Sequence, residues 1–228
     1  MGKAIEAIAL ERKHSIALTI DIGNLKDNTI ENIKKADVAI EFTGPESAFD
    51  NIIRCMDAGV PVVSGSTGWL ERFEEAKKYC LDHKGAFLYA SNFSVGVNIF
   101  FAINKKLAEM MASHPSYDVF INEIHHTAKL DAPSGTAITL AEQVLQYNKH
   151  KDHWVNQPAH SHAELAILSE RVVPAPGTHK VKYTSSIDDI EIIHTAHNRK
   201  GFATGAVLAA EFLKDKKGIF TMQDVLAI

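Results

Sequence analysis

The sequence predicts an α/β fold in two domains, a parallel-sheet domain and a smaller α+β domain with a mixed or open sheet. Three observations support this prediction. Short apolar strand patterns alternate with helical patterns over the first ninety residues, which is typical of a parallel, doubly wound sheet. Further along, three strand patterns follow one another without helices between them. The chain then ends on a helical pattern, so we expect residues 1–93 and 196–228 to form the first domain and residues 94–195 the second.

The first domain is expected to hold four short strands with helices between them. Phe49 and Met56 begin and end one apolar helical stripe, and a second helical pattern covers residues 70–81. We expect Thr43 to cap the first of these helices, with Pro45 in its first turn and Glu46 completing a capping box. The expected strands are Ser15–Asp21, Asp37–Phe42, Pro61–Ser64 and Ala86–Ala90.

Polar turns at the ends of these strands indicate a nucleotide site. Doubly wound sheets bind nucleotides at the carboxyl edge, and Gly65-Ser-Thr-Gly68 follows a strand there. Asp21 ends its strand about twenty residues after Gly2, where the acid of a Rossmann-like domain binds the adenosine ribose. On spacing alone, an ordinary turn aspartate is an equally good interpretation. With no arginine beside it, Asp21 should repel a 2′-phosphate and favour NADH.

The beginning of the chain departs from that fold. A Rossmann-like domain should open with an apolar strand and a Gly-x-Gly-x-x-Gly turn, whereas this chain opens at Met1 in a helical pattern. Gly2 matches only the last glycine. Each missing ladder bond or core side chain costs on the order of 1 kcal/mol, against a total stability of about 5–15 kcal/mol. We therefore expect the chain as it stands to bind dinucleotide poorly or to fold badly, and Met1 to be a misassigned start.

Composition excludes several classes of protein. The net charge of −4 and pI near 6.3 give no indication of a nucleic-acid partner. No apolar run approaches the roughly 20 residues of a membrane span, and Glu6 and Glu11 interrupt any signal peptide. Cys55 and Cys80 lie in helical patterns and are expected to be reduced core thiols. The chain is expected to be a soluble, cytoplasmic protein.

The second domain is expected to begin with a long helix, Val95–Met111, and to hold a helix that starts near Ser134. A polar loop with several histidines covers residues 147–162. The last helix is expected at Gly205–Leu213. An open sheet of this kind often serves as an oligomer interface. The expected strands are Val119–His125, Glu164–Val173, His179–Ser185 and Asp189–His194.

Polar chemistry is concentrated in residues 123–137, Glu-Ile-His-His-Thr-Ala-Lys-Leu-Asp-Ala-Pro-Ser-Gly-Thr-Ala. The segment combines imidazoles, an ammonium group and a helix start. Helix N-termini attract anions through unsatisfied N–H groups, so the amides of Gly135 and Thr136 suit a carboxylate. Lys129 and His126 add positive charge, and a histidine moves protons near neutral pH. This segment is therefore expected to bind a small anionic substrate and to transfer a proton.

These fifteen residues are similar to the signature of the 4-hydroxy-tetrahydrodipicolinate reductase family, also called dihydrodipicolinate reductases, of bacterial lysine and diaminopimelate synthesis. Likeness to the family extends over nearly the whole chain, and its members are typically tetramers that use NADH or NADPH. The supporting segments are Glu41–Glu46, Gly65–Gly68, Ala90–Asn98 and Arg199–Ala206.

The resemblance implies a reaction and a role for each matching residue. Nicotinamide gives a hydride to an unsaturated cyclic dicarboxylate, and either Lys129 or His125 supplies the proton. His125 is the family's acid/base histidine, and His126, Gly135 and Thr136 bind substrate. Ser66 stands where threonine is common. The expected cofactor-binding residues are Gly2, Asp21, Gly65, Ser66, Thr67, Ala90, Ser91, Asn92 and Phe93.

Other interpretations of these residues remain. The chain could be a truncated, catalytically impaired reductase, or a metal-dependent hydrolase that uses His125, His126 and Asp131. A metal site is not expected, and the histidines of residues 150–162 are assigned to a solvated loop. Glu123 and Asp131 either bind substrate or serve to position the loop or cap the helix. Arg199 either reaches the active site or braces the last helix.

Overall fold

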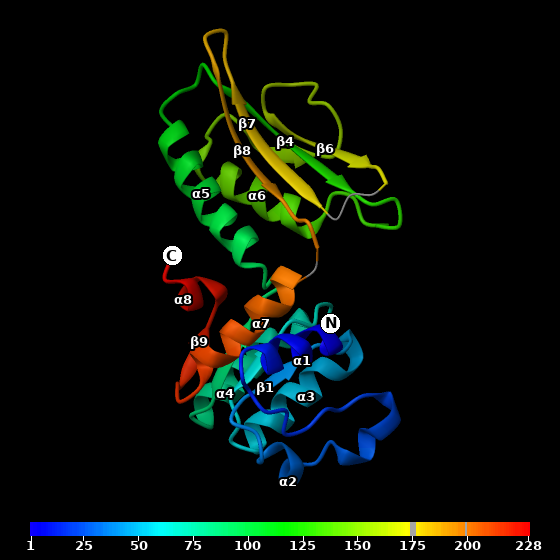
Figure 1. Cartoon of the computed structure of the whole chain (residues 1–228). Coiled ribbons are helices and arrows are strands. Elements are labelled where there is room, and N and C mark those ends of the chain that lie inside the picture. The colour runs from blue at the N-terminus through cyan, green and yellow to red at the C-terminus, as the bar shows by residue number, and fades with distance from the viewer. Residues whose placement is uncertain (174–176, 199) are drawn as a thin grey trace. The chain divides into compact units, whose positions relative to one another are not determined.

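The computed structural model describes residues 1–173, 177–198 and 200–228, and these form two compact units (Figure 1). The first unit comprises Met1–Val95 and Lys200–Ile228, and the second comprises Gly96–Arg199. The chain therefore leaves the first unit and returns to it. These boundaries differ by two to four residues from those expected from the sequence.

The first unit is built on a parallel sheet of four strands. β1 (Ala39–Glu41), β2 (Val62–Ser64), β3 (Ala86–Tyr89) and β9 (Gly218–Phe220) pair in that order, each parallel to its neighbour. The parallel sheet expected from the sequence is thus confirmed. β9 was not expected, because three residues that include a glycine carry too short a pattern.

The expected strand at residues 15–21 is wrong. These residues form no strand, and most of their side chains are exposed, with Ile16 38% exposed. A strand needs a neighbour that satisfies its N–H and C=O groups. Within the described residues, nothing pairs with residues 15–21, and β1 pairs only with β2. The segment instead continues into a 3₁₀ turn, η1 (Ile22–Asp27), and the short helix α2 (Ile30–Ile33).

Helices cover both faces of the parallel sheet. Successive strand residues point to opposite sides, and apolar residues on both sides need to be buried. Val62 and Phe87 face the side packed by α3 (Pro45–Asp57) and α4 (Phe73–Asp82), the latter preceded by the 3₁₀ turn η2 (Leu70–Arg72). Val63 and Leu88 face the side packed by α7 (Lys200–Leu213). The sheet is therefore doubly wound, as predicted.

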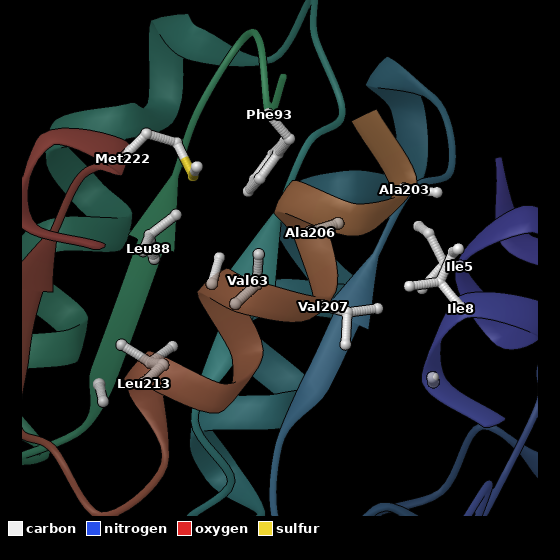
Figure 2. Packing of buried hydrophobic residues seen from close by; sticks show 13 residues of the cluster. Ile5, Ile8, Val63, Leu88, Phe93, Ala203, Ala206, Val207, Leu213 and Met222 are labelled. Carbon is white, nitrogen blue, oxygen red and sulfur yellow. The ribbon is translucent and has the colours of Figure 1, made fainter. Parts of the chain in front are cut away.

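Two further helices pack beside α7 in the same apolar cluster. Figure 2 shows Ile5 and Ile8 of α1 (Gly2–Glu11) facing Ala203 and Val207 of α7, while Met222 of α8 (Met222–Leu226) lies near Leu88. The chain thus begins in a helix, as its pattern predicts. α7 begins five residues before the expected start. Among the described residues, no helix has the length and apolar character required to cross a membrane.

The start of α3 differs from the prediction. Gly44, not Thr43, is its N-cap, and Pro45 is the first helical residue. The Thr43 hydroxyl instead donates a hydrogen bond to the carboxylate of Glu41. A buried carboxylate at the end of β1 therefore competes successfully for the side chain that the sequence assigns to capping.

The second unit is a mixed sheet packed against two helices on one face. α5 (Val95–Met111) and α6 (Gly135–Tyr147) bury apolar side chains against the strands (Figure 1). The strand order is β5-β6-β4-β7-β8, with parallel pairs from β5 to β4 and antiparallel pairs from β4 to β8. The mixed sheet is confirmed, although β5 lies in the segment predicted as loop. The strands are β4 (Asp118–His125), β5 (His153–Val155), β6 (Glu164–Arg171), β7 (Thr178–Thr184) and β8 (Asp189–Thr195).

Candidate active site

One end of the helix-covered face of the mixed sheet is polar. On β4, Val119 and Ile121 point into the apolar core, and the alternation continues with Glu123 and His125 on the same face. The strand register places His179 of β7 and Ser169 of β6 on either side of Glu123. The next row pairs His125 with Arg171 of β6. Five side chains with acidic, basic or hydroxyl groups therefore meet where the apolar core ends.

Glu123 is fully buried and accepts several hydrogen bonds. Ser169 Oγ donates to Oε1 at 2.7 Å, and Arg171 approaches the same oxygen at 3.2 Å. The N–H of Ser134 lies 3.1 Å from both carboxylate oxygens. Burial by itself raises the pKa of Glu123, but the hydrogen bonds from Ser134 and Ser169 bring it below its usual value. Glu123 is therefore a carboxylate anion at neutral pH.

Ser134 joins this network to the start of α6. Its Oγ accepts a hydrogen bond from the N–H of Ala137, which makes Ser134 the N-cap of the helix, as its position predicts. The same Oγ shares a 3.0 Å hydrogen bond with Nε2 of His179. Burial lowers the pKa of His179 to about 4, so this imidazole is neutral at pH 7.

His125 is 8% exposed at the end of β4. Its Nδ1 lies 3.4 Å from Oε2 of Glu123. On the other side of the ring, a Cβ at Gly177 would lie only 3.2 Å from Nε2, so glycine at this position leaves room beside that nitrogen. Burial lowers the pKa of His125, as do the charges of Lys129 and Arg171, while the charge of Glu123 opposes the shift. The neutral imidazole is thus favoured at pH 7.

The loop after β4 carries the other residues expected in the substrate site. The Lys129 ammonium is paired with the Asp131 carboxylate at 2.7 Å. Arg171 donates to the backbone oxygens of Lys129 and Asp131, which ties the loop to β6. His126 is half-buried, and its carbonyl oxygen accepts a hydrogen bond from the Lys129 N–H. Asp131 therefore holds Lys129 in this structure.

The start of α6 presents two amides. Within the described residues, the N–H groups of Gly135 and Thr136 have no hydrogen-bond acceptor, as expected for the first turn of a helix. A Cβ at Gly135 would meet no atom within 4 Å, so this position is open. The residues predicted to bind a carboxylate thus lie directly after Ser134 in an open helix start.

The residues described in the structure contain one group with the composition of a metal site, formed by Glu123, His125 and His179. It differs from the set of His125, His126 and Asp131 considered from the sequence. Arg171 and the Ser134 amide already contact the Glu123 carboxylate. A dication at this carboxylate would also lie near the Arg171 guanidinium. The group therefore resembles a charge-compensated hydrogen-bond network more than a metal centre.

The residues expected to bind cofactor lie in the first unit, at turns after parallel strands. Gly65–Thr67 follows β2 and Ala90–Phe93 follows β3. Because the strands are parallel, their carboxyl ends meet at one edge of the sheet. Thr67 and Ser91 are exposed there, and Asn92 Oδ1 accepts a hydrogen bond from the Ser94 N–H.

Two of these expected residues are buried. Ser66 is 4% exposed and its hydroxyl donates to Glu41. Phe93 is 2% exposed and packs 5.4 Å from the ring of Phe42. Its carbonyl oxygen would lie 1.7 Å from a Cβ at Gly205, so only glycine fits at that point of α7. The Phe93 side chain is therefore part of the core, and only its backbone is left to contact a ligand.

Glu41 ties the turns together, although its sequence position alone suggested no role for it. Its carboxylate accepts hydrogen bonds from Ser64 Oγ at 2.6 Å, from Ser66 Oγ and from the Thr43 N–H at 2.8 Å. The turns after β1 and β2 thus share one buried acidic side chain. A single acid in the otherwise apolar segment 38–42 is the signal that could have identified it.

The other two cofactor residues lie at element starts. Gly2 is the first residue of α1 and is exposed, and a Cβ at this position would meet no atom within 4 Å. Asp21 does not end a strand as predicted. It caps η1, where its carboxylate accepts a hydrogen bond from the Ile22 N–H and the Asn24 side chain accepts one from the Asp21 N–H. Its carboxylate is exposed.

Comparison with known proteins identifies the relatives of this chain. Residues 1–93 match the model described as dihydrodipicolinate reductase, N-terminus, and residues 96–226 match the corresponding C-terminus. The chain belongs to the dihydrodipicolinate reductase family. It is accordingly an NAD(P)H-dependent oxidoreductase, as the resemblance of its motifs predicted.

Individual relatives agree with this assignment. A 4-hydroxy-tetrahydrodipicolinate reductase of Christiangramia forsetii is 51% identical over 227 residues, which cover 100% of this chain and 94% of that protein. A 4-hydroxy-tetrahydrodipicolinate reductase of Neisseria gonorrhoeae is 30% identical, and the match covers 98% of this chain and 84% of that protein. The structure of a dipicolinate-bound dihydrodipicolinate reductase from Paenisporosarcina sp. TG-14 shares the fold, with a TM-score of 0.77 at 21% identity over 98% of this chain and 94% of that one.

Three members of the polar cluster, Ser169, Arg171 and His179, were not predicted from the sequence. A signal for them exists in the alternation of the strands. Leu165 and Ile167 continue into Ser169 and Arg171 on the buried face of β6. Arg199, which was considered for the active site, lies outside the described residues.

Proposed function

We propose that this chain reduces 4-hydroxy-tetrahydrodipicolinate to tetrahydrodipicolinate with NADH or NADPH, as a step of lysine and diaminopimelate biosynthesis. Family membership supports the reaction. The observation that carries the assignment of the substrate site is that Glu123 contacts both His125 and the Ser134 cap of α6, while the Lys129 charge acts on His125. Two amides and a cation suit a doubly charged ring.

Each residue of this site has a proposed role. The N–H groups of Gly135 and Thr136 bind one carboxylate of the substrate at the positive end of α6. Lys129 and His126 attract the dianion. Lys129 can bind the substrate while it stays paired with Asp131. Its ammonium has three N–H donors, and the Asp131 carboxylate uses only some of them. The site therefore recognises negative charge through backbone dipoles and the Lys129 ammonium.

Lys129 is the proposed proton donor of the reduction. Burial lowers the pKa of His125, so its imidazole is mostly neutral near pH 7 and a poor source of protons. The Lys129 ammonium has three N–H groups from which a proton can be donated. Neutral His125 then orients the substrate or relays the proton. A reductase whose rate survives Lys129→Ala but not His125→Ala contradicts this order of roles.

The turns of the first unit fit a dinucleotide. A Cβ at Gly65 would lie 2.3 Å from the Phe42 ring, so glycine at this position allows the turn to lie close to the sheet edge. Gly2 lies open at the start of α1, and the hydroxyl of Thr67 is exposed. Gly2, Gly65–Thr67 and Ala90–Asn92, with the Phe93 backbone, would hold the cofactor. When bound, it supplies the hydride.

NADH is the proposed preferred cofactor. The Asp21 carboxylate is exposed, and no ion pair among the described residues neutralises it. It would accept hydrogen bonds from ribose hydroxyls and repel a 2′-phosphate. We expect a higher kcat/KM for NADH than for NADPH, and the opposite order would overturn this preference.

We further propose that the first unit binds dinucleotide and that the second binds substrate and forms a cytoplasmic homotetramer. The sheet face turned away from α5 and α6 supports an assembly role, because it presents Phe120 and the 55% exposed Ile193 beside charged Lys180. Sedimentation velocity tests the assembly. A monomer at micromolar concentration would contradict it.

A coupled assay tests the proposed reaction. The product of the preceding synthase is supplied to the purified chain, and the loss of reduced-nicotinamide absorbance is followed. We expect steady turnover that depends on both components. Absence of turnover in a protein that unfolds cooperatively, and is therefore folded, would overturn the proposal.

A further inference from the structure

Glu123 contacts both parts of the proposed substrate site. Its Oε2 atom lies 3.4 Å from Nδ1 of His125, and its oxygens accept the Ser134 N–H at 3.1 Å. Ser134 is the residue that caps α6. One buried carboxylate therefore lies between the imidazole at the end of β4 and the first turn of the helix.

The Nδ1 atom of His125 requires a partner. It is buried, and within the described residues it makes no hydrogen bond of good geometry. A buried polar atom without a partner costs about 1–3 kcal/mol. The acid that pairs with this imidazole among the described residues is Glu123. A small rotation of either side chain would turn their 3.4 Å contact into a hydrogen bond, because N–H···O distances reach about 3.2 Å.

We propose that Glu123 is a positioning residue for the reduction, with its carboxylate holding His125 in the tautomer that carries hydrogen on Nδ1. Nε2, the nitrogen beside Gly177, is then the one that meets the substrate or the transferred proton. The same carboxylate fixes the amide of Ser134 and so the start of α6. This inference rests on the proposed function, because it gives His125 a role at the substrate.

The surrounding charges make an anionic Glu123 stable. Arg171 lies 3.2 Å from Oε1, and Ser169 donates to that oxygen at 2.7 Å. Oε2 is the oxygen nearer to both imidazoles, with Nε2 of His179 at 3.7 Å. One oxygen is thus engaged by Arg171 and Ser169, while the other faces His125. The charged and titratable groups that face His125 are Glu123, Lys129, Asp131, Arg171 and His179.

The substitution Glu123→Gln removes the negative charge of the side chain and keeps its shape. Glutamine keeps the volume and a carbonyl oxygen for the Ser134 amide, but its NH₂ group would donate toward an imidazole. The matched control is Glu109→Gln, which removes an exposed carboxylate from α5. Imidazole ¹⁵N shifts of His125 report its tautomer and pKa without any need for activity.

In the wild type and in Glu109→Gln, we expect neutral His125 to carry its hydrogen on Nδ1. In Glu123→Gln, the hydrogen should move to Nε2, and the pKa of His125 should fall because an attractive negative charge is lost. An unchanged tautomer and pKa in a folded Glu123→Gln protein would overturn the proposal. Stoichiometric zinc in purified wild type that Glu123→Gln loses would also overturn it, since the carboxylate would then be a metal ligand.

Kinetics distinguish positioning from a structural role. Glu123→Gln should lower kcat about tenfold or more, with the KM for the dicarboxylate nearly unchanged because the Ser134 amide keeps its acceptor. A rise in KM with unchanged kcat would contradict the proposal. If the wild type does not reduce the substrate, yet Glu123→Gln still switches the tautomer, the proposed function fails and the positioning contact stands.

Discussion

Glu123 and His179 face each other directly across the antiparallel ladder of β4 and β7, and their carboxylate and imidazole groups lie 3.7 Å apart. The pair is buried at the end of an apolar sheet face. His179 stays neutral there despite a neighbouring anion, because burial outweighs attraction to Glu123. Ser134, the cap of α6, therefore contacts both a neutral imidazole and a charged carboxylate.

The buried His179 should make stability depend on pH. Its pKa is about 4 in the folded chain and about 6.5 when unfolded, so only the unfolded chain gains a proton between these values. Stability should be complete above pH 6.5 and fall by about 3 kcal/mol at most as the pH drops toward 4. Urea unfolding at several pH values measures this change. His179→Gln, which cannot titrate, should show a smaller fall, and an equal fall would contradict the assignment.

Ser134→Ala should weaken substrate binding through the helix start. The variant loses the cap of α6 and the partner of His179, so we expect a loss of about 1 kcal/mol in the free energy of unfolding and a higher KM for the dicarboxylate. Thr29→Ala, which removes the cap of α2 in the first unit, is the control. It should lower stability without changing that KM. Equal KM values in wild type and Ser134→Ala would count against the site.

Gly177→Ala should crowd the proposed reactive nitrogen. The new Cβ would lie 3.2 Å from Nε2 of His125, and the backbone φ of +149° disfavours alanine. We expect kcat/KM to fall about tenfold, equivalent to about 1.4 kcal/mol. Gly59→Ala is the control, since it also has a positive φ but nothing within 4 Å. A matching loss of activity in both variants would show that crowding at His125 is unimportant.

Glu41→Gln should affect cofactor binding alone. The substitution places a donor among hydroxyl groups that now donate to a carboxylate, which disturbs the turns after β1 and β2. The KM for NADH should rise while the KM for the dicarboxylate stays constant. Glu46→Gln removes a nearby exposed charge and should change neither constant. A selective effect on the dicarboxylate would contradict the proposed division of roles.

Alternation and capping explain why much of the fold was predictable. The helix Val95–Met111, the strand ending at His125 and the Ser134 cap all follow from local patterns that tertiary packing reinforces. Residues 15–21 carry an equally apolar pattern but form no strand, because pairing depends on a neighbour and not on the segment itself. The local sequence specifies which face of a segment is apolar. Pairing with a neighbouring strand then decides whether that segment becomes part of the sheet.

The polar clusters show the same limit. His125 and Glu123 were singled out from the sequence because both belong to the fifteen-residue motif of residues 123–137. His179, Arg171 and Glu41 were missed because their partners come from other strands. Strand register, which single-sequence patterns do not define, brings them together. Thr43 was misassigned for this reason, since its hydroxyl binds the buried Glu41 and does not cap the helix.

Binding of pyridine-2,6-dicarboxylate, measured by titration calorimetry, tests the central claim that the end of β4 and the start of α6 hold a doubly charged ring. We expect wild type and Lys106→Ala, which removes an exposed lysine of α5, to bind equally well. Lys129→Ala should bind at least about tenfold more weakly, a loss of about 1.4 kcal/mol. Equal affinity in all three proteins would contradict the claim.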